Sequence, residues 1–194
     1  MEYDPEKHHR RSIRLKSFDY SLPGAYFVTL LAYRRKRLFG EIHKGELVHN
    51  DVGTKVLECW LHIPTSFKNA ELDEYVLMPN HLHGIIIINE SDGKGKAFAN
   101  FDSDFDVLTS ANALSLRQTG TQSGSLNAII QNFKSVSTRL INKEFFEPGM
   151  KLWQRNYYEH IIRNERELYE IRRYIINNPA QWQLDNEHPN NFKT

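Results

Sequence analysis

Two histidines separated by one residue form the first pair of side chains that could do chemistry. His81 and His83 begin a run rich in isoleucine, which is typical of a buried β-strand. Successive side chains of a strand point to opposite faces, so both imidazoles emerge on one face and could share a cation. A histidine-triad pattern would need a third histidine two residues on, where Ile85 stands. The pair is therefore either part of a metal site or two surface polar residues at a strand entrance.

A tyrosine and an asparagine near the C-terminus form the second pair. Tyr174 and Asn178 are four residues apart in a segment with helical periodicity, so they lie one above the other on the same helix face. This spacing could deliver together a phenol that attacks phosphorus and an amide oxygen that completes a metal site. It fits equally well a tyrosine packed in the core beside Ile171 and Ile175, followed by an asparagine that caps the helix.

The elements that must position these pairs follow from apolar periodicity and turn signals. The sequence predicts strands over 25–33, 72–78, 81–89 and 157–162, and helices over about 51–63, 126–142 and 165–177. A short hairpin or irregular stretch covers 38–48. This order predicts an α+β fold with a ferredoxin-like or RRM-like antiparallel sheet of the split βαβ type, helices packed on one face, and an added C-terminal helix that carries Tyr174.

Length and composition predict one domain over residues 1–194. The chain is 40% hydrophobic and 25% charged, as ordinary globular proteins are, and its formal charge of +1 gives no argument for nucleic-acid binding. The single cysteine excludes an internal disulfide and a cysteine-rich zinc site. No apolar run approaches the roughly 20 residues of a membrane span, and the polar start is not a signal peptide. We therefore expect a cytoplasmic protein without membrane contact.

Two segments stand apart from the predicted sheet. Residues 1–24 form a basic N-terminal arm with little apolar periodicity. Residues 91–124 are dominated by Gly, Ser, Asp, Asn and Thr without a sustained period, which predicts a long mobile loop or insertion.

Three blocks of sequence, taken in order, carry a family resemblance. They are VLMPNHLHGI at 76–85, WQRNYYEHIIR at 153–163 and YIINNP at 174–179. Together they resemble the single-tyrosine HUH transposases of the IS200-like family, and within it the REP-associated tyrosine transposase branch. The resemblance extends from about residue 11 to 182, apart from the 91–124 segment.

The resemblance implies a metal-dependent enzyme that nicks, transfers and rejoins single-stranded or hairpin DNA, with REP-like repeats as candidate targets. His81 and His83 would bind a divalent metal, Mg²⁺ or Mn²⁺, and Asn178 occupies the position of the third protein ligand, which in other members is often Gln. Tyr174 would be the nucleophile and would form a 5′-phosphotyrosine intermediate while a 3′-hydroxyl leaves. Similar proteins are often dimers, so a second copy of this chain is a candidate partner.

Basic side chains in several segments could neutralise DNA phosphates. They lie in the N-terminal arm, at the exit of the first strand, on the second helix and in the second block. The candidates are Arg11, Arg14, Lys16, Arg34, Arg35, Arg37, Lys134, Arg139 and Arg163. Solvated surface charge is the alternative for each of them.

Two other functions stay open from the residues alone. A non-catalytic nucleic-acid-binding module of the same fold would bind without regard to chelator or to His81→Ala. A metal hydrolase that uses water would leave Tyr174 as a core residue, and its cleavage would persist in Tyr174→Phe.

Overall fold

The computed structural model describes residues 22–90, 122–185, 187, 188 and 191. Most of the expected N-terminal arm and of the expected insertion lies outside these residues. The candidate DNA contacts Arg11, Arg14 and Lys16 lie outside them as well.

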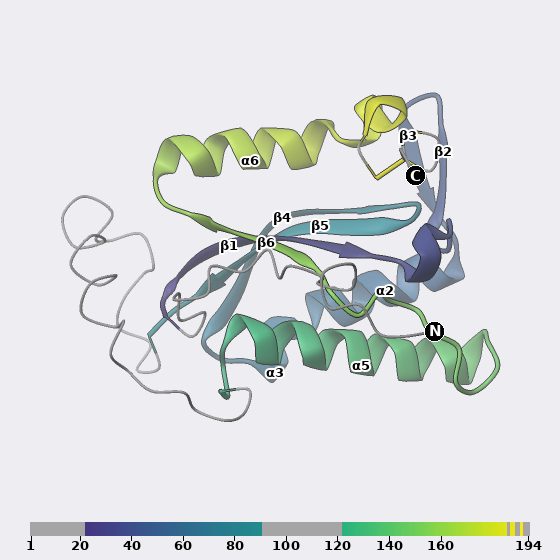
Figure 1. Cartoon of the computed structure of the whole chain (residues 1–194), viewed down its shortest axis with the longest axis horizontal. Helices are drawn as coiled ribbons and strands as arrows, with labels where there is room; N and C mark the ends of the chain where they lie inside the picture. Colours follow the sequence, from purple (N-terminus) through teal and green to yellow (C-terminus); the bar gives the residue numbers. More distant parts are fainter. Residues whose placement is uncertain (1–21, 91–121, 186, 189–190, 192–194) are drawn as a thin grey trace, which may run out of the picture.

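A four-stranded antiparallel sheet forms the centre of the molecule (Figure 1). Its strands are β1 (Gly24–Leu31), β4 (Ala70–Met78), β5 (His81–Ile88) and β6 (Tyr158–Ile162). Their order in the sheet is β4-β5-β1-β6, with every neighbouring pair antiparallel. This is the order that a split βαβ unit produces, and it confirms the predicted α+β fold.

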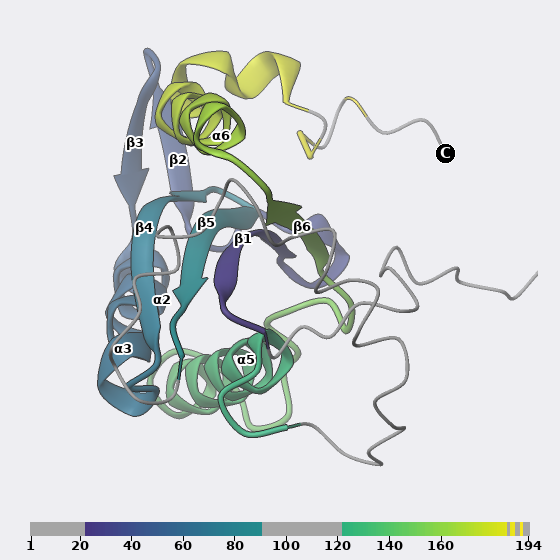
Figure 2. The same ribbon diagram turned by 90° about the vertical axis from the view of Figure 1, so that its left-hand side faces the viewer.

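Helices cover both faces of the sheet, but unequally. On one face lie α2 (Asp51–Leu61), the short α3 (Ile63–Ser66) and α5 (Leu126–Glu144), whereas α6 (Glu165–Asn177) lies on the opposite face (Figures 1 and 2). Side chains cap the three long helices: Asn50, Ser125 and Asn164 each accept a hydrogen bond from a backbone N–H three residues on. Among the α-helices of the described residues, the C-terminal helix that carries Tyr174 is therefore the one that covers this second face.

Strand β5 divides its side chains between these two faces. Leu82 and Ile86 belong to the cluster under α2 and α5, while Ile85 and Ile87 belong to the cluster under α6. Gly84 points to the α2 face, where an added Cβ would lie 2.5 Å from the Trp60 ring. Glycine at this position therefore lets the indole pack directly against the strand.

A separate two-stranded hairpin follows the first strand. It consists of β2 (Gly40–His43) and β3 (Glu46–His49), which is the first of the two alternatives expected over 38–48, a hairpin or an irregular stretch. Gly40 has φ +146°, and a Cβ there would lie 2.2 Å from the Val48 carbonyl oxygen, so the close approach of the two strands requires glycine. Among the described residues, no helix combines the length and apolarity that crossing a membrane demands.

Candidate metal and nucleophile site

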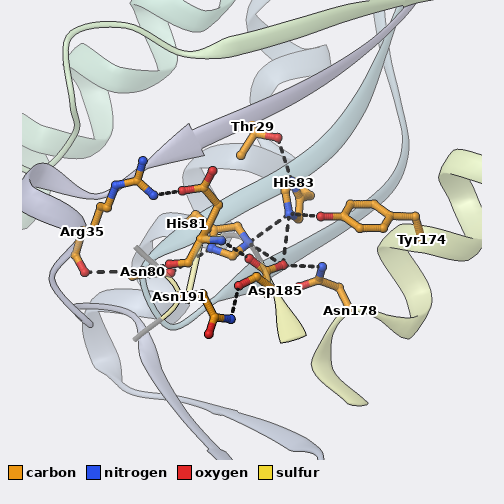
Figure 3. A network of polar contacts seen from close by, with 10 residues as sticks. Thr29, Arg35, Asn80, His81, His83, Tyr174, Asn178, Asp185 and Asn191 are labelled. Carbon is orange, nitrogen blue, oxygen red and sulfur yellow. Dashed lines mark hydrogen bonds and ion pairs between the residues drawn. The ribbon is translucent and has the colours of Figure 1, made fainter. Parts of the chain in front are cut away.

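The paired histidines are buried beneath α6. His81 is 0% exposed and His83 3% exposed, so the alternative that they are surface residues at a strand entrance is wrong. Their Nε2 atoms lie 3.0 Å apart, as the alternation of side chains along β5 predicted (Figure 3).

Neighbouring polar side chains orient both imidazoles. His81 Nδ1 lies 2.8 Å from Asn80 Oδ1, an oxygen that can only accept, so Nδ1 carries the proton and donates it. The Asn80 amide nitrogen donates to the carbonyl oxygen of Glu187, which fixes the orientation of the amide. Thr29, the partner of His83 across β1 and β5, places its hydroxyl 2.8 Å from His83 Nδ1. The Nε2 lone pair of His81 therefore faces His83, and His83 presents its own when its Nδ1 donates to Thr29.

Asp185 is a candidate metal ligand that no motif in the sequence indicated. Its Oδ2 lies 4.0 Å from the Nε2 atom of each histidine, and the three residues form a buried group that could hold a metal ion. The 3₁₀ helix η3 (Pro179–Leu184) turns the chain back after α6 and brings Asp185 over the end of β5. This segment has no periodicity, so no spacing in the sequence signals the contact.

Asn178 joins the group from the end of α6. It is 2% exposed, and its Nδ2 donates to Asp185 Oδ2 at 2.8 Å. Its Oδ1 is buried and has no hydrogen-bond partner in the described part of the chain. A buried amide oxygen without a donor is costly unless another group satisfies it, so it fits the role of a metal ligand.

Tyr174 reaches the histidines from α6. Its hydroxyl lies 3.2 Å from His83 Nε2, and its ring meets the rings of His83 and Phe27 edge to face. Tyr174 is 43% exposed, so the alternative of a tyrosine packed in the core is wrong; Ile175 is the buried residue. Burial, followed by the charges of Asp185 and Glu187, raises the pKa of the phenol to about 12, so the hydroxyl is protonated at neutral pH.

The electrostatics of the group suit a cation. Burial, with His83 and Arg35 nearby, lowers the pKa of His81 well below its ordinary value, so the imidazole is neutral. Burial of the Asp185 carboxyl opposes ionisation, but contacts with His83 and His81 and the N–H groups of Asn178 and Glu187 hold its pKa well below the usual range. Two imidazoles, a carboxylate and an amide oxygen together form a donor set that fits a divalent cation.

The basic cluster at the exit of β1 packs against the C-terminal segment. Arg35 pairs with Glu187, and the Arg37 guanidinium lies 3.5 Å from His188 Nε2. Arg34 is exposed, with its guanidinium over the Tyr33 ring. Of these candidate DNA contacts, Arg35 has a charge that is already compensated by a carboxylate of the same chain.

The remaining candidate DNA contacts are divided in the same way. Lys134 donates from Nζ to the carbonyl oxygens of Gln154, Arg155 and Asn156, so its ammonium has a structural role. Arg139 and Arg163 are exposed. The sequence showed that these residues are charged, but it could not show which of them contact other groups of the chain.

Comparison with known proteins agrees with the fold and with the family resemblance. Residues 119–178, which include Tyr174 and Asn178, match the family described as "Transposase IS200 like". A protein of Haemophilus influenzae, described only as uncharacterized, is 42% identical over 186 residues, which cover 95% of this chain and 96% of the relative. The solved structure of a REP-associated tyrosine transposase bound to a REP hairpin has the same fold, with a TM-score of 0.52 and 16% identity over 87% of this chain and 74% of that one.

The family match over residues 119–178 places the chain among DNA-processing enzymes of the transposase class, and the solved structure shows the same fold. The chain belongs to the IS200-like transposase family, as the three sequence blocks predicted.

Proposed function

We propose that this chain cleaves and rejoins single-stranded or hairpin DNA through a covalent 5′-phosphotyrosine on Tyr174. One observation carries the proposal: the Tyr174 hydroxyl lies 3.2 Å from His83 Nε2, which itself lies 3.0 Å from His81 Nε2. A phosphate held at the two histidines would thus be within reach of the phenol oxygen.

The residues that would hold a divalent cation, Mg²⁺ or Mn²⁺, are His81, His83, Asp185 and Asn178. The unsatisfied Asn178 Oδ1 and the converging ligand atoms of the other three support this set. When bound, such a cation supplies positive charge that stabilises the negative charge growing on the phosphate and favours the phenolate.

In the cleavage step, the Tyr174 oxygen forms a bond to phosphorus and loses its proton. The bond from phosphorus to the 3′-oxygen breaks, and this oxygen leaves with a proton as a 3′-hydroxyl. Rejoining reverses the roles, because a 3′-hydroxyl attacks the phosphotyrosine and Tyr174 recovers its proton. The phosphotyrosine conserves the energy of the original bond, so no nucleotide cofactor is needed.

The contacts that would make up the site all lie within one chain. Tyr174 meets His83 of its own chain, and Asp185 arrives through the turn that follows α6. We therefore propose that each copy can attack with its own tyrosine, and that a homodimer, if formed, serves to bring two DNA ends together.

An adduct assay tests the proposal. A hairpin with single-stranded flanks is labelled at its 3′ end, because the fragment on the 3′ side of the nick stays attached to the tyrosine, and is incubated with protein and Mn²⁺. Wild type should give a labelled protein band that survives denaturing electrophoresis, and Tyr174→Phe or a chelator should abolish it. Tyr169→Phe is the matched control, because Tyr169 lies exposed on the same helix under Arg173.

Each other outcome would overturn the proposal in a recognisable way. An adduct that survives Tyr174→Phe would exclude this nucleophile. Cleavage without an adduct in Tyr174→Phe would favour a hydrolase that uses water. DNA binding without cleavage, unaffected by chelator and by His81→Ala, would favour a non-catalytic binding module.

A further inference from the structure

A groove of about 470 Å³ lies on the molecule away from the site described above. It is formed by the C-terminal half of α5 and by the segment 149–155, which leads to β6. Four cationic side chains line it, and none of its described lining residues is acidic: the cations are Lys134, Arg139, Lys151 and Arg155. We call this surface the basic groove.

The exposed arginines of the basic groove differ from several other cations of the described residues. Arg35, Arg172 and Lys55 each pair with a carboxylate. Arg139 and Arg155, by contrast, are exposed and form no ion pair with any residue that the structure describes. Uncompensated charge gathered in one concavity attracts a polyanion.

Lys134 gives the basic groove a fixed wall. Its Nζ donates to three successive carbonyl oxygens, of residues 154, 155 and 156, at 3.0 to 3.4 Å, and lies 5.1 Å from the centre of the Tyr157 ring. These bonds hold the backbone that carries Arg155 against α5. The position of Arg155 is therefore built into the fold, whereas an ordinary surface loop would leave it free to move.

The basic groove lies at the same end of the sheet as the paired histidines. Trp153 forms a bridge with Ala32 just beyond β1, and Gln154 N donates to Leu31 O. On its other side, Leu31 pairs with His81. One strand thus separates the segment that lines the basic groove from the strand that carries the histidines.

Cationic side chains also lie close together between the basic groove and the exit of β1. The Arg34 guanidinium lies 5.5 Å from the centre of the Tyr33 ring, and the Lys151 ammonium lies 5.4 Å from the same centre. Arg34 and Arg35 both have φ of 55°, an uncommon left-handed conformation that turns the chain sharply at the exit of β1. Positive charge therefore continues from the basic groove around the end of the sheet.

We propose that the basic groove binds backbone phosphates of the substrate DNA at a distance from the cleaved bond. The inference rests on the proposed function, because it assumes that DNA is the polyanion. A DNA strand carries one charge every 3.4 Å, so a strand leaving the histidines can follow the cations at Tyr33 into the basic groove. The groove then anchors the DNA that flanks the reacting phosphate and takes no part in the chemistry.

Binding measurements test the basic groove separately from catalysis. In a Tyr174→Phe background with chelator, the affinity for a labelled DNA hairpin with flanks is measured by fluorescence anisotropy over a range of salt. Arg139→Gln with Arg155→Gln should lower the affinity about tenfold near 0.15 M salt and reduce the salt slope by about two. Lys68→Gln with Arg166→Gln removes the same charge from exposed positions elsewhere and should change neither.

A second variant and a second substrate complete the test. Lys151→Gln alone should reduce the salt slope by about one, and melting curves verify that each variant is folded. An unchanged affinity and slope in both groove variants would overturn the inference. Tighter binding of the matching RNA hairpin, with the same losses, would overturn the assignment to DNA.

The adduct assay separates failure of the inference from failure of the proposed function. With Tyr174 present, the double groove variant should need about tenfold more DNA than wild type to form half of its maximal adduct. No adduct from wild type itself would reject the proposed function, whatever the groove variants do. A normal adduct together with wild-type binding by the groove variants would reject the basic groove alone.

Discussion

The face of the sheet under α2 and α5 packs large apolar side chains, whereas the face under α6 combines a small apolar cluster with buried polar groups. On the first face, the Phe133 ring contacts the rings of Trp60 and Trp153 at centroid distances of 5.3 and 5.5 Å. On the second, Phe27 and Ile175 represent the apolar cluster. Beyond them lie the four polar residues of the candidate site, all buried: His81, His83, Asn178 and Asp185.

The apolar face thus stabilises the fold, and the opposite face of the same strands holds the polar groups of the candidate site. Burying imidazole, amide and carboxylate groups costs free energy that their mutual contacts only partly return. The dense apolar face supplies the compensating stability, because burial of large side chains is the main favourable contribution to folding. Strand β5 serves both, since the residues that alternate with the histidines pack into the apolar core.

Truncating a large side chain on the apolar face should destabilise the fold and leave the candidate site unchanged. Trp60 is fully buried, so Trp60→Ala should lower the free energy of unfolding by about 3–5 kcal/mol. Denaturant unfolding followed by circular dichroism measures this loss. Trp60→Phe is the control: the indole N–H has no hydrogen-bond partner among the described residues, so its removal strands no acceptor and the cost should be clearly smaller. A loss below about 1 kcal/mol for Trp60→Ala would contradict the role given to this face.

A change next to the histidines should instead affect the candidate site and weaken metal binding. Asn80→Ala removes the acceptor that orients His81, and loss of such a partner typically weakens metal binding about 10- to 100-fold. Titration calorimetry with Mn²⁺ measures the affinity. Asn80→Asp keeps an acceptor for His81 Nδ1 and should retain most of it. Asn69→Ala, which removes an amide bonded to Gly124 O on the far side of the sheet, should have no effect; equal affinities in all of these variants would reject the positioning role of Asn80.

Where a segment has the period of a strand or a helix, the sequence predicted which of its side chains lie on the same face. Alternation along 81–89 predicted that the two imidazoles share a face, and helical spacing over 165–177 predicted that Tyr174 and Asn178 do. The order of the elements predicted the sheet. The contact between Tyr174 and His83 spans 91 residues, and only the family resemblance suggested it before the strands and α6 were placed.

The sequence could not predict contacts made by segments without a period. Asp185 follows a 3₁₀ turn whose direction depends on how Trp182 packs beside His81. Lys134 was predicted to contact DNA because its charge is visible in the sequence. Its carbonyl acceptors lie in an irregular segment, where nothing local indicates their direction.

The contrast between Lys134 and Arg139 on α5 sharpens this point. Lys134→Met should lower the free energy of unfolding by about 1 kcal/mol, because three carbonyl groups lose a charged donor at a partly exposed position. Arg139→Met, five residues further along the same helix, should stay within about 0.5 kcal/mol of wild type. Urea unfolding of both variants measures the difference. Equal losses would mean that Lys134 is an ordinary surface charge.

The ion pair that fastens α6 to the sheet should give the smallest effect, and it depends on pH. Arg172 Nε donates to Asp73 Oδ1 on β4 at 2.7 Å, and this hydrogen bond lowers the pKa of Asp73 below its ordinary value of 3.8. Because the pKa of Asp73 is lower in the folded protein than in the unfolded chain, the pair stabilises the fold at pH values above the ordinary pKa. This stabilisation is lost as the pH falls through the pKa of the folded protein. Because the pair is partly exposed, Arg172→Met should cost only about 0.5–1 kcal/mol at pH 7. The difference from wild type should shrink below about pH 4 and vanish in stronger acid, as urea unfolding at several pH values can measure. Arg166→Met, whose partner Glu170 lies on the same helix, should leave the attachment of α6 unchanged; a loss that is constant with pH in Arg172→Met would assign the effect to the packing of its aliphatic stem.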